Sequence, residues 1–338
     1  MKNPITINDI AFELGVSKST VSRALRNEPN VKKEVRSKIL AFAKEKGYTR
    51  NEYAINFRNK STKIIGIVVP EMITSFYVNF ITRIQSILYA KGFHTIISIS
   101  NENPDVEKDN LLMMESYRVE GILISACHNK KNIDIYRRLI DKGIPLVFFD
   151  RTINELAVPK VKIDDYIKSF FMMEYLIRSG RKQIIHLAGP SYIQNTLERK
   201  NAYRDALEKF HLPFDQENII ESGVNFEDGE KAMEAFMKKQ IPFDAIFCFT
   251  EMSALGAKKF LQKLHYSIPE DVAICCVSGT VLSSLVYPTM TVIEQPVELM
   301  ADYCVELLME KLDNMDGPNR TVILEAKMII RDSTKVDE

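Results

Sequence analysis

Residues 6–26 read TINDIAFELGVSKSTVSRALR, and this stretch decides how the first part of the chain folds. Thr6 precedes apolar residues at helical spacing and is a good N-terminal cap, while Gly15 ends that helix. Ser17 caps a second helix, whose buried stripe begins at Val21. Two short capped helices joined by a glycine turn are typical of a helix-turn-helix.

A third helix is predicted from about Lys32 to Lys46, with Gly47 at its end. Residues 48–63 then lose helical periodicity and become polar, as a linker would. The residues of the third helix that we expect to face inward are Val35, Ile39, Leu40 and Ala43.

From residue 64 the pattern changes to short apolar runs, most of them followed by an amphipathic helix. Such runs predict parallel sheets covered on both faces, and about 270 residues suit two doubly wound lobes better than one. Ligands of these folds bind beyond the carboxyl ends of the strands. The apolar runs are 64–69, 95–99, 121–125, 146–150, 183–187, 245–249, 272–277 and 290–293.

The charge is unevenly distributed between these two parts. The whole chain has a formal net charge of zero, but residues 1–60 carry 13 basic and 6 acidic side chains. The remaining 278 residues carry 32 basic and 39 acidic side chains. This asymmetry favours a DNA-binding module joined to a module that need not touch DNA.

Composition excludes several other classes of protein. The N-terminus lacks the apolar stretch of a signal peptide and no run is long enough to cross a membrane, so we expect a cytoplasmic protein with no membrane partner. No P-loop, nucleophile elbow, HExxH or CxxC motif occurs, and the histidines are dispersed, so neither an enzyme nor a cofactor or metal is predicted. The five cysteines are interpreted as reduced core residues, although Cys275 and Cys276 could instead form a redox pair.

The predicted second helix carries the chemistry of a DNA-reading surface. In a helix-turn-helix this helix lies in the major groove, and residues 17–23 supply short polar groups for phosphates, with Lys18 and Arg23 able to donate to guanine. Charge and periodicity alone leave an alternative, a solvated basic helix without any partner.

A resemblance decides between these interpretations. The stretches TINDIA at 6–11 and GVSKSTVSRAL at 15–25 resemble the headpiece of the LacI/GalR family of bacterial regulators. The similarity continues through IGIVVP at 65–70, and it covers nearly the whole chain. Further similar stretches, in the same order as in the family, are 120–124, 150–151, 187–189, 254–257, 269–272 and 295–296.

The resemblance implies a fold and a function. The fold would be an N-terminal all-α helix-turn-helix headpiece followed by a two-lobed α/β core like that of periplasmic binding proteins. The function would be sequence-specific transcription regulation, as a repressor, by a homodimer on palindromic double-stranded operator DNA. A small-molecule effector, a sugar or sugar derivative, would bind in the cleft between the lobes.

The implied domain limits are residues 1–60 for the headpiece and residues 61–338 for the core. Within the core, the N-lobe is predicted to comprise about 61–161 and 291–321. The C-lobe is predicted to comprise about 162–290 and 322–338.

The resemblance also assigns DNA contacts residue by residue. Lys18, Ser19 and Arg23 match base-reading positions. Residues 51–58 match a hinge helix that enters the minor groove, and Phe57 stands at the position that wedges into the central base step. The alternative for Phe57 is a staple between headpiece and core. The other matching positions are, near phosphates, Thr6, Ser17, Thr20, Ser22, Arg26 and Asn30, and, in the hinge, Asn51 and Ala54.

In the core, the resemblance implies an effector site at the strand ends. Arg199 matches a pocket arginine, and Phe226 and Phe76 match aromatic residues of the pocket, whereas Asp150 and Gln295 follow apolar runs where a pocket residue belongs. Each has a plainer alternative: a surface helix residue for Arg199, core packing for the aromatics and a turn cap for Asp150.

Two anchors of this site depart from the family pattern. Thr250 and Glu251 replace the usual Asn-Asp, and Ser278 and Gly279 replace a usual Asp-Asp. With fewer acids opposing Arg199, we expect an effector that is an unusual or anionic sugar. One rival is a regulator that no longer senses anything. A transport-type binding receptor with the same core would need export, and we expect no signal peptide here but do expect a headpiece.

Overall fold

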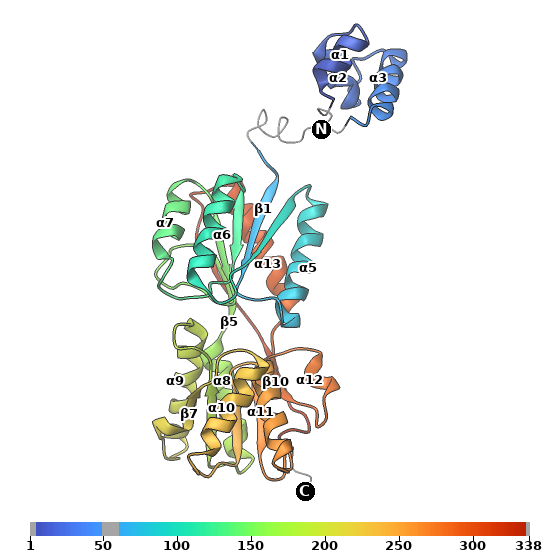
Figure 1. The fold of residues 1–338 in the computed structure, drawn as a ribbon. Helices are drawn as coiled ribbons and strands as arrows, with labels where there is room; N and C mark the ends of the chain where they lie inside the picture. Colours follow the sequence, from blue (N-terminus) through green and yellow to red (C-terminus); the bar gives the residue numbers. More distant parts are fainter. Residues whose placement is uncertain (1–4, 49–60, 336–338) are drawn as a thin grey trace. The chain divides into compact units, whose positions relative to one another are not determined.

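The computed structural model describes residues 5–48 and 61–335, and the chain divides into two compact units, Met1–Thr62 and Lys63–Glu338 (Figure 1). The first unit contains α1 (Ile7–Glu13), α2 (Lys18–Leu25) and α3 (Lys33–Glu45). The predicted limits of the third helix, about Lys32 and Lys46, are therefore confirmed to within one residue at each end.

Local sequence explains these helices. The Thr6 hydroxyl accepts a hydrogen bond from the Asp9 backbone N–H while the Asp9 carboxylate accepts one from the Thr6 N–H, which closes a capping box. Ile10, Val21 and Ile39 are fully buried in the small core that joins the three helices. Leu40 was predicted to face inward and is 44% exposed, because its neighbour Ile39 takes the core-facing position of α3.

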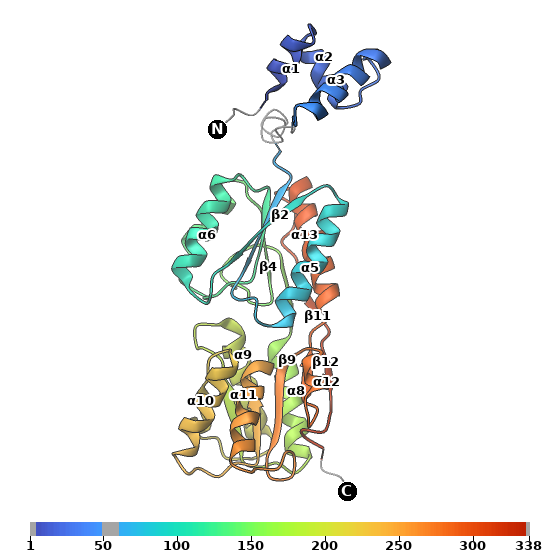
Figure 2. The same ribbon diagram turned by 45° about the vertical axis from the view of Figure 1, so that its right-hand side comes forward.

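The first lobe of the second unit is a six-stranded parallel sheet in the order β11-β5-β4-β3-β1-β2. Figure 1 shows α6 and α7 on one face and α5 and α13 on the other, and Figure 2 shows the same arrangement for α6, α5 and α13. Its strands are β1 (Ile64–Val69), β2 (His94–Ile99), β3 (Gly121–Ile124), β4 (Leu146–Phe149), β5 (Lys160–Ile163) and β11 (Thr321–Leu324). Its helices are α5 (Ser75–Ala90), α6 (Pro104–Ser116), α7 (Ile133–Asp141) and α13 (Val297–Asp313).

Burial on both faces explains why the strands read as continuous apolar runs. Along β3, Leu123 packs in the cluster that contains α5 and α13, while its neighbours Ile122 and Ile124 pack in the cluster that contains α6 and α7. Because successive strand residues point to opposite faces, every position of a strand buried in this way is apolar.

The second lobe is a six-stranded sheet in the order β12-β10-β9-β8-β6-β7, parallel except for the antiparallel β10–β12 pair. Side chains of α8 and α9 pack in one core cluster and those of α10 and α11 in the other. Its strands are β6 (Ile184–Ala188), β7 (Ile219–Glu221), β8 (Ala245–Cys248), β9 (Ala273–Gly279), β10 (Thr291–Glu294) and β12 (Lys327–Ile329). Its helices are α8 (Asp165–Arg178), α9 (Gln194–Lys209), the 3₁₀ turn η1 (Gln216–Asn218), α10 (Phe226–Met237), α11 (Glu251–Lys263) and α12 (Leu282–Leu285).

The chain passes between the two sheets after β5, after β10 and between β11 and β12. This order corrects the predicted lobe limits. β10 was assigned to the N-lobe as part of 291–321 but pairs with β9 in the second sheet. β11 lies largely in the segment 322–338 that was assigned to the C-lobe, yet it pairs with β5 in the first sheet. An apolar run predicts a strand without saying which sheet it joins.

Candidate DNA-binding surface and effector site

Helix α2 presents a polar, basic face that its own capping holds in place. The Ser17 hydroxyl accepts from the Thr20 backbone N–H at 3.1 Å and lies 2.8 Å from the Ser19 hydroxyl. Since Val21 and Ala24 are fully buried, the opposite face of α2 must turn outward. Lys18, Ser19 and Arg23 are all exposed on that face.

The predicted phosphate contacts have varied surroundings. Asn30 is exposed, and Thr20 and Ser22 are half-buried. Thr6 and Arg26 are exposed but already have partners: Thr6 is held in its capping box, and the Arg26 guanidinium lies 3.0 Å from the Glu28 carboxylate. The hinge residues Asn51, Ala54 and Phe57 lie outside the described residues.

Asp150, directly after β4, connects the two lobes. It has a positive φ of 55° and its carboxylate accepts from the Tyr77 hydroxyl at 2.9 Å. The side-chain amide of Gln295, which follows β10 of the other sheet, donates to the same carboxylate at 3.4 Å. The structure therefore brings two of the predicted residues together across the lobes, because the carboxyl ends of both sheets meet here.

Phe76 lies in the core, whereas its neighbour Tyr77 carries the polar contact. Phe76 packs edge-to-face on Tyr77 at 4.9 Å between ring centroids and stacks on Phe80. Burial, with Asp150 nearby, raises the pKa of Tyr77 well above its usual value, so its hydroxyl remains a donor. Sequence reasoning missed Tyr77 because the start of α5 leaves open which of two adjacent aromatics faces the strand ends.

Arg199, predicted as a pocket residue, is nearly fully buried rather than a surface residue of α9. Its Nε donates to the Asp165 carboxylate at 2.7 Å, and its Nη1 donates to the Phe249 carbonyl. The Phe249 ring covers the guanidinium with 4.3 Å between its central carbon and the ring centroid. Asp165 was not predicted, since it lies 34 residues away in sequence.

The remaining predicted effector residues belong to loops of the second lobe. Thr250 caps α11 and donates to the Val224 carbonyl at 2.9 Å. Glu251 is buried and accepts from the backbone and hydroxyl of Thr280, which closes the loop after β9. Ser278 is half-buried with a φ of 63°, and Phe226 is half-buried at the start of α10.

A second contact between the lobes is made by His128 and Asn129 with Tyr192, none of which was predicted as a site residue. The Asn129 backbone N–H donates to the Tyr192 carbonyl at 3.0 Å. The His128 ring stacks on the Tyr192 ring with 5.1 Å between centroids and 8° between planes. Burial and nearby Lys131 lower the pKa of His128, which keeps the imidazole neutral in this stack.

Buried histidine and cysteine side chains serve as core residues. His186 is fully buried and its Nδ1 lies 2.8 Å from the Phe247 carbonyl, and burial lowers its pKa to about 3. All five cysteines are free and buried. Cys275 and Cys276 pack in clusters on opposite faces of β9, which argues against the redox pair considered from the sequence.

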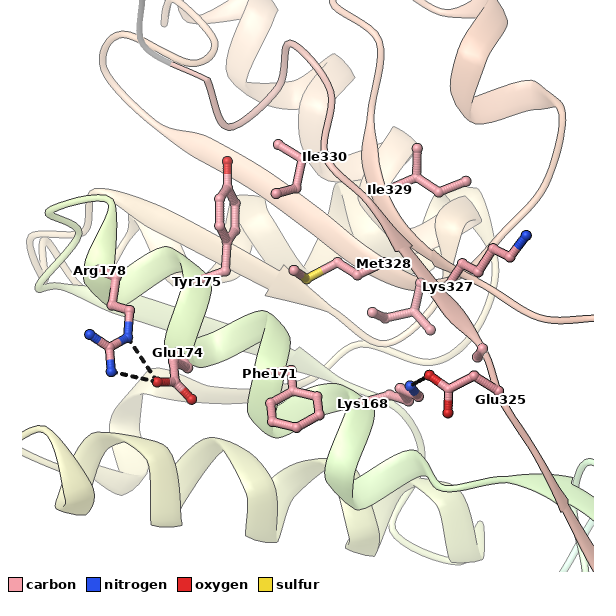
Figure 3. A pocket seen from close by; sticks show the side chains of 12 residues that line it. Lys168, Phe171, Glu174, Tyr175, Arg178, Glu325, Lys327, Met328, Ile329 and Ile330 are labelled. Atoms are coloured by element: carbon pink, nitrogen blue, oxygen red, sulfur yellow. Dashed lines mark hydrogen bonds and ion pairs between the residues drawn. The ribbon is translucent and has the colours of Figure 1, made fainter.

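A groove of about 840 Å³ lies elsewhere, between α8 and β12 (Figure 3). Its walls are apolar, with Phe171 and Met328 facing each other and an ion pair of Lys168 with Glu325 at one end. None of the predicted effector residues lines it. Among the described residues, no cluster could hold a metal ion and no helix is long and apolar enough to cross a membrane.

Comparisons with known proteins match both units. The family model described as bacterial regulatory proteins, lacI family, matches residues 6–51, and that of periplasmic binding proteins and the sugar-binding domain of the LacI family matches residues 62–317. The chain is 28% identical to catabolite control protein A of Priestia megaterium, over 98% of this chain and 99% of that protein. It is 29% identical to the sucrose operon repressor of Streptococcus mutans, over 94% and 96%.

Among solved structures, the Lac repressor dimer bound to operator and the anti-inducer ONPF matches with a TM-score of 0.85. That match covers 99% of this chain and all of the other at 20% identity, so it supports the fold alone. The predicted fold class, a helix-turn-helix headpiece with a two-lobed core, is confirmed. With family models matching most of its length, the chain belongs to the LacI family of bacterial regulatory proteins.

Proposed function

We propose that the protein is a transcription repressor that acts in the cytoplasm, where a homodimer binds palindromic operator DNA under the control of a sugar-type effector. The DNA-binding part of this proposal rests on one observation. Helix α2 is capped, and burial of its opposite face leaves Lys18, Ser19 and Arg23 exposed together. We assign base reading to these three and positioning on phosphates to Ser17, Thr20 and Asn30.

The effector half is supported by the polar residues at the facing strand ends. Asp150, Gln295 and Arg199 would bind the effector, with Phe226 and Ser278 at its edge. Thr250 and Glu251 would shape the loops around it, since their side chains are occupied by contacts within the second lobe. A ligand held by residues of both lobes closes one lobe on the other, which is how binding can change the DNA affinity.

Selection from random duplex DNA with the purified full chain tests the DNA-binding half. We expect a palindrome whose half-sites lie about one helical turn apart to be enriched. Enrichment of no sequence, or of an unpaired single half-site, would contradict the proposal.

A further inference from the structure

The buried ion pair of Arg199 with Asp165 is the feature that sequence reasoning did not anticipate. Both side chains are almost completely inaccessible, with 2% and 1% of each exposed, and Nη2 lies 2.6 Å from the carboxylate. Asp165 begins α8, directly after the chain crosses from β5, whereas Arg199 lies in α9. The two meet because both helices cover the same face of the second sheet.

The geometry leaves Arg199 a limited donor capacity. A guanidinium has five N–H groups in a planar fork. Nε donates to the Asp165 carboxylate, which also lies 2.6 Å from Nη2, and one N–H of Nη1 donates to the Phe249 carbonyl. The guanidinium is almost completely inaccessible, and its positive charge is already matched by a carboxylate.

The other charged side chains at the strand ends are either ion-paired or negative. Arg151 pairs with Glu102, just as Arg199 pairs with Asp165. By contrast, Asp150 and Glu251 form no ion pair with any described residue, and their carboxylates are held by hydroxyl and amide donors. Asp150 therefore offers an acceptor for hydroxyl groups at the strand ends, where no described residue supplies a buried cation without a carboxylate partner.

We propose that Asp165 sets the charge selectivity of the effector site, so that the site binds an uncharged polyhydroxyl effector and rejects the acidic derivative of the same compound. The inference rests on the proposed effector function. Neutral hydroxyl groups can donate to Asp150, and the matched charge of Arg199 does not attract an anion. An anionic group there meets Asp165 and Asp150 as like charges, so the anionic effector expected from the sequence is replaced by a neutral one.

The same pair makes the selectivity depend on pH. Burial raises the pKa of Asp165 to about 6, against the lowering effect of Arg199, and Asp150 and Glu198 raise it further. Arg199, Asp150 and Glu198 are the charged groups with the largest effect on Asp165. Below about pH 6 the protonated Asp165 leaves Arg199 as an unmatched cation, so acidic sugars gain affinity as the pH falls.

The test uses sugars in pairs that differ by one carboxylate: glucose with glucuronate, and galactose with galacturonate. Calorimetric titration at pH 7.5 compares the wild-type chain with Asp165→Asn, which keeps an acceptor for Arg199. The matched control is Asp205→Asn, which removes the same charge from a partly exposed position of α9. We expect the neutral sugar of each pair to bind the wild type at least about tenfold more tightly than its acid does. Asp165→Asn should shift this ratio of affinities about tenfold toward the acid, whereas Asp205→Asn should leave it unchanged.

A wild-type chain that binds the acidic member more tightly at pH 7.5 would overturn the inference, as would equal ratios in the wild type and Asp165→Asn. If Asp165→Asn does not fold, titration of the wild type with uronates at pH 7.5 and at pH 5 tests the inference instead, because uronates stay ionised over this range. We expect their affinity to rise with acidification, and a constant affinity would refute the inference. Binding of neither member of either pair would overturn the proposed sugar effector itself, while leaving the DNA selection unaffected.

Discussion

Arg23 and Lys32 are both exposed cations of the headpiece, but only Arg23 lies on α2 beside Lys18 and Ser19. Arg23→Ala should remove a base contact worth roughly 1–3 kcal/mol and relax the preference at one base pair of each half-site. Lys32→Ala should weaken all sequences about equally and reduce the salt slope of binding. Anisotropy titrations on the selected palindrome and its single-base variants measure both. Equal loss of preference in the two variants would contradict the assignment of base reading to α2.

Single residues also show where prediction from the sequence stops. Ser17 and Val21 were predicted because capping and periodicity act within one turn of helix. Tyr77 and Asp165 could not be found in the same way, because each acquires its role from a partner that only the sheet topology brings near. Arg199 was predicted by resemblance, but the resemblance did not predict the Asp165 carboxylate that pairs with it.

At the scale of elements, strands buried on both faces were predictable, and short edge or polar strands were not. β1 and β9 are long apolar runs, whereas β7 and β12 are three-residue strands at the edges of their sheet. β5 alternates lysine with apolar residues, so it lacks a continuous run. β11 is an edge strand with two exposed positions. Their identity as strands comes from pairing partners far away in sequence.

The contact between α10 and α11 depends on two glycines. A Cβ atom at Gly256 would lie 2.0 Å from the Phe226 carbonyl oxygen, and one at Gly229 would lie 2.1 Å from the Ser253 carbonyl oxygen. The Phe226 carbonyl oxygen belongs to the backbone and cannot rotate away from the new Cβ atom. Gly256→Ala should therefore force the helices apart and lower the free energy of unfolding by about 1–3 kcal/mol. Urea denaturation measures this change. Gln262→Ala, on the exposed face of α11, serves as the control, and a similar stability of both variants would refute this packing argument.

At the scale of the whole molecule, we expect the second copy to bind at the exposed apolar residues around α12. The exposed fractions are 73% for Leu285, 88% for Tyr287 and 67% for the nearby Val281. Three exposed apolar side chains this close in the chain are more than isolated surface residues would explain. Leu285→Glu should yield monomers and weaken binding to the palindrome, since each copy supplies one recognition helix. Sedimentation velocity at several concentrations checks this, with Ile323→Glu as the control at another exposed apolar position. A dimer of unchanged affinity in Leu285→Glu would place the interface elsewhere.

We expect a ligand bound between the lobes to control the affinity of the headpiece for DNA. The most direct test is the dissociation constant for the selected palindrome, measured with and without a sugar that raises the melting temperature of the wild-type chain. We predict that the sugar changes this constant by about 5- to 150-fold, the usual range of coupling between two sites. A sugar that stabilises the core but leaves this constant unchanged would show that the ligand does not control DNA binding.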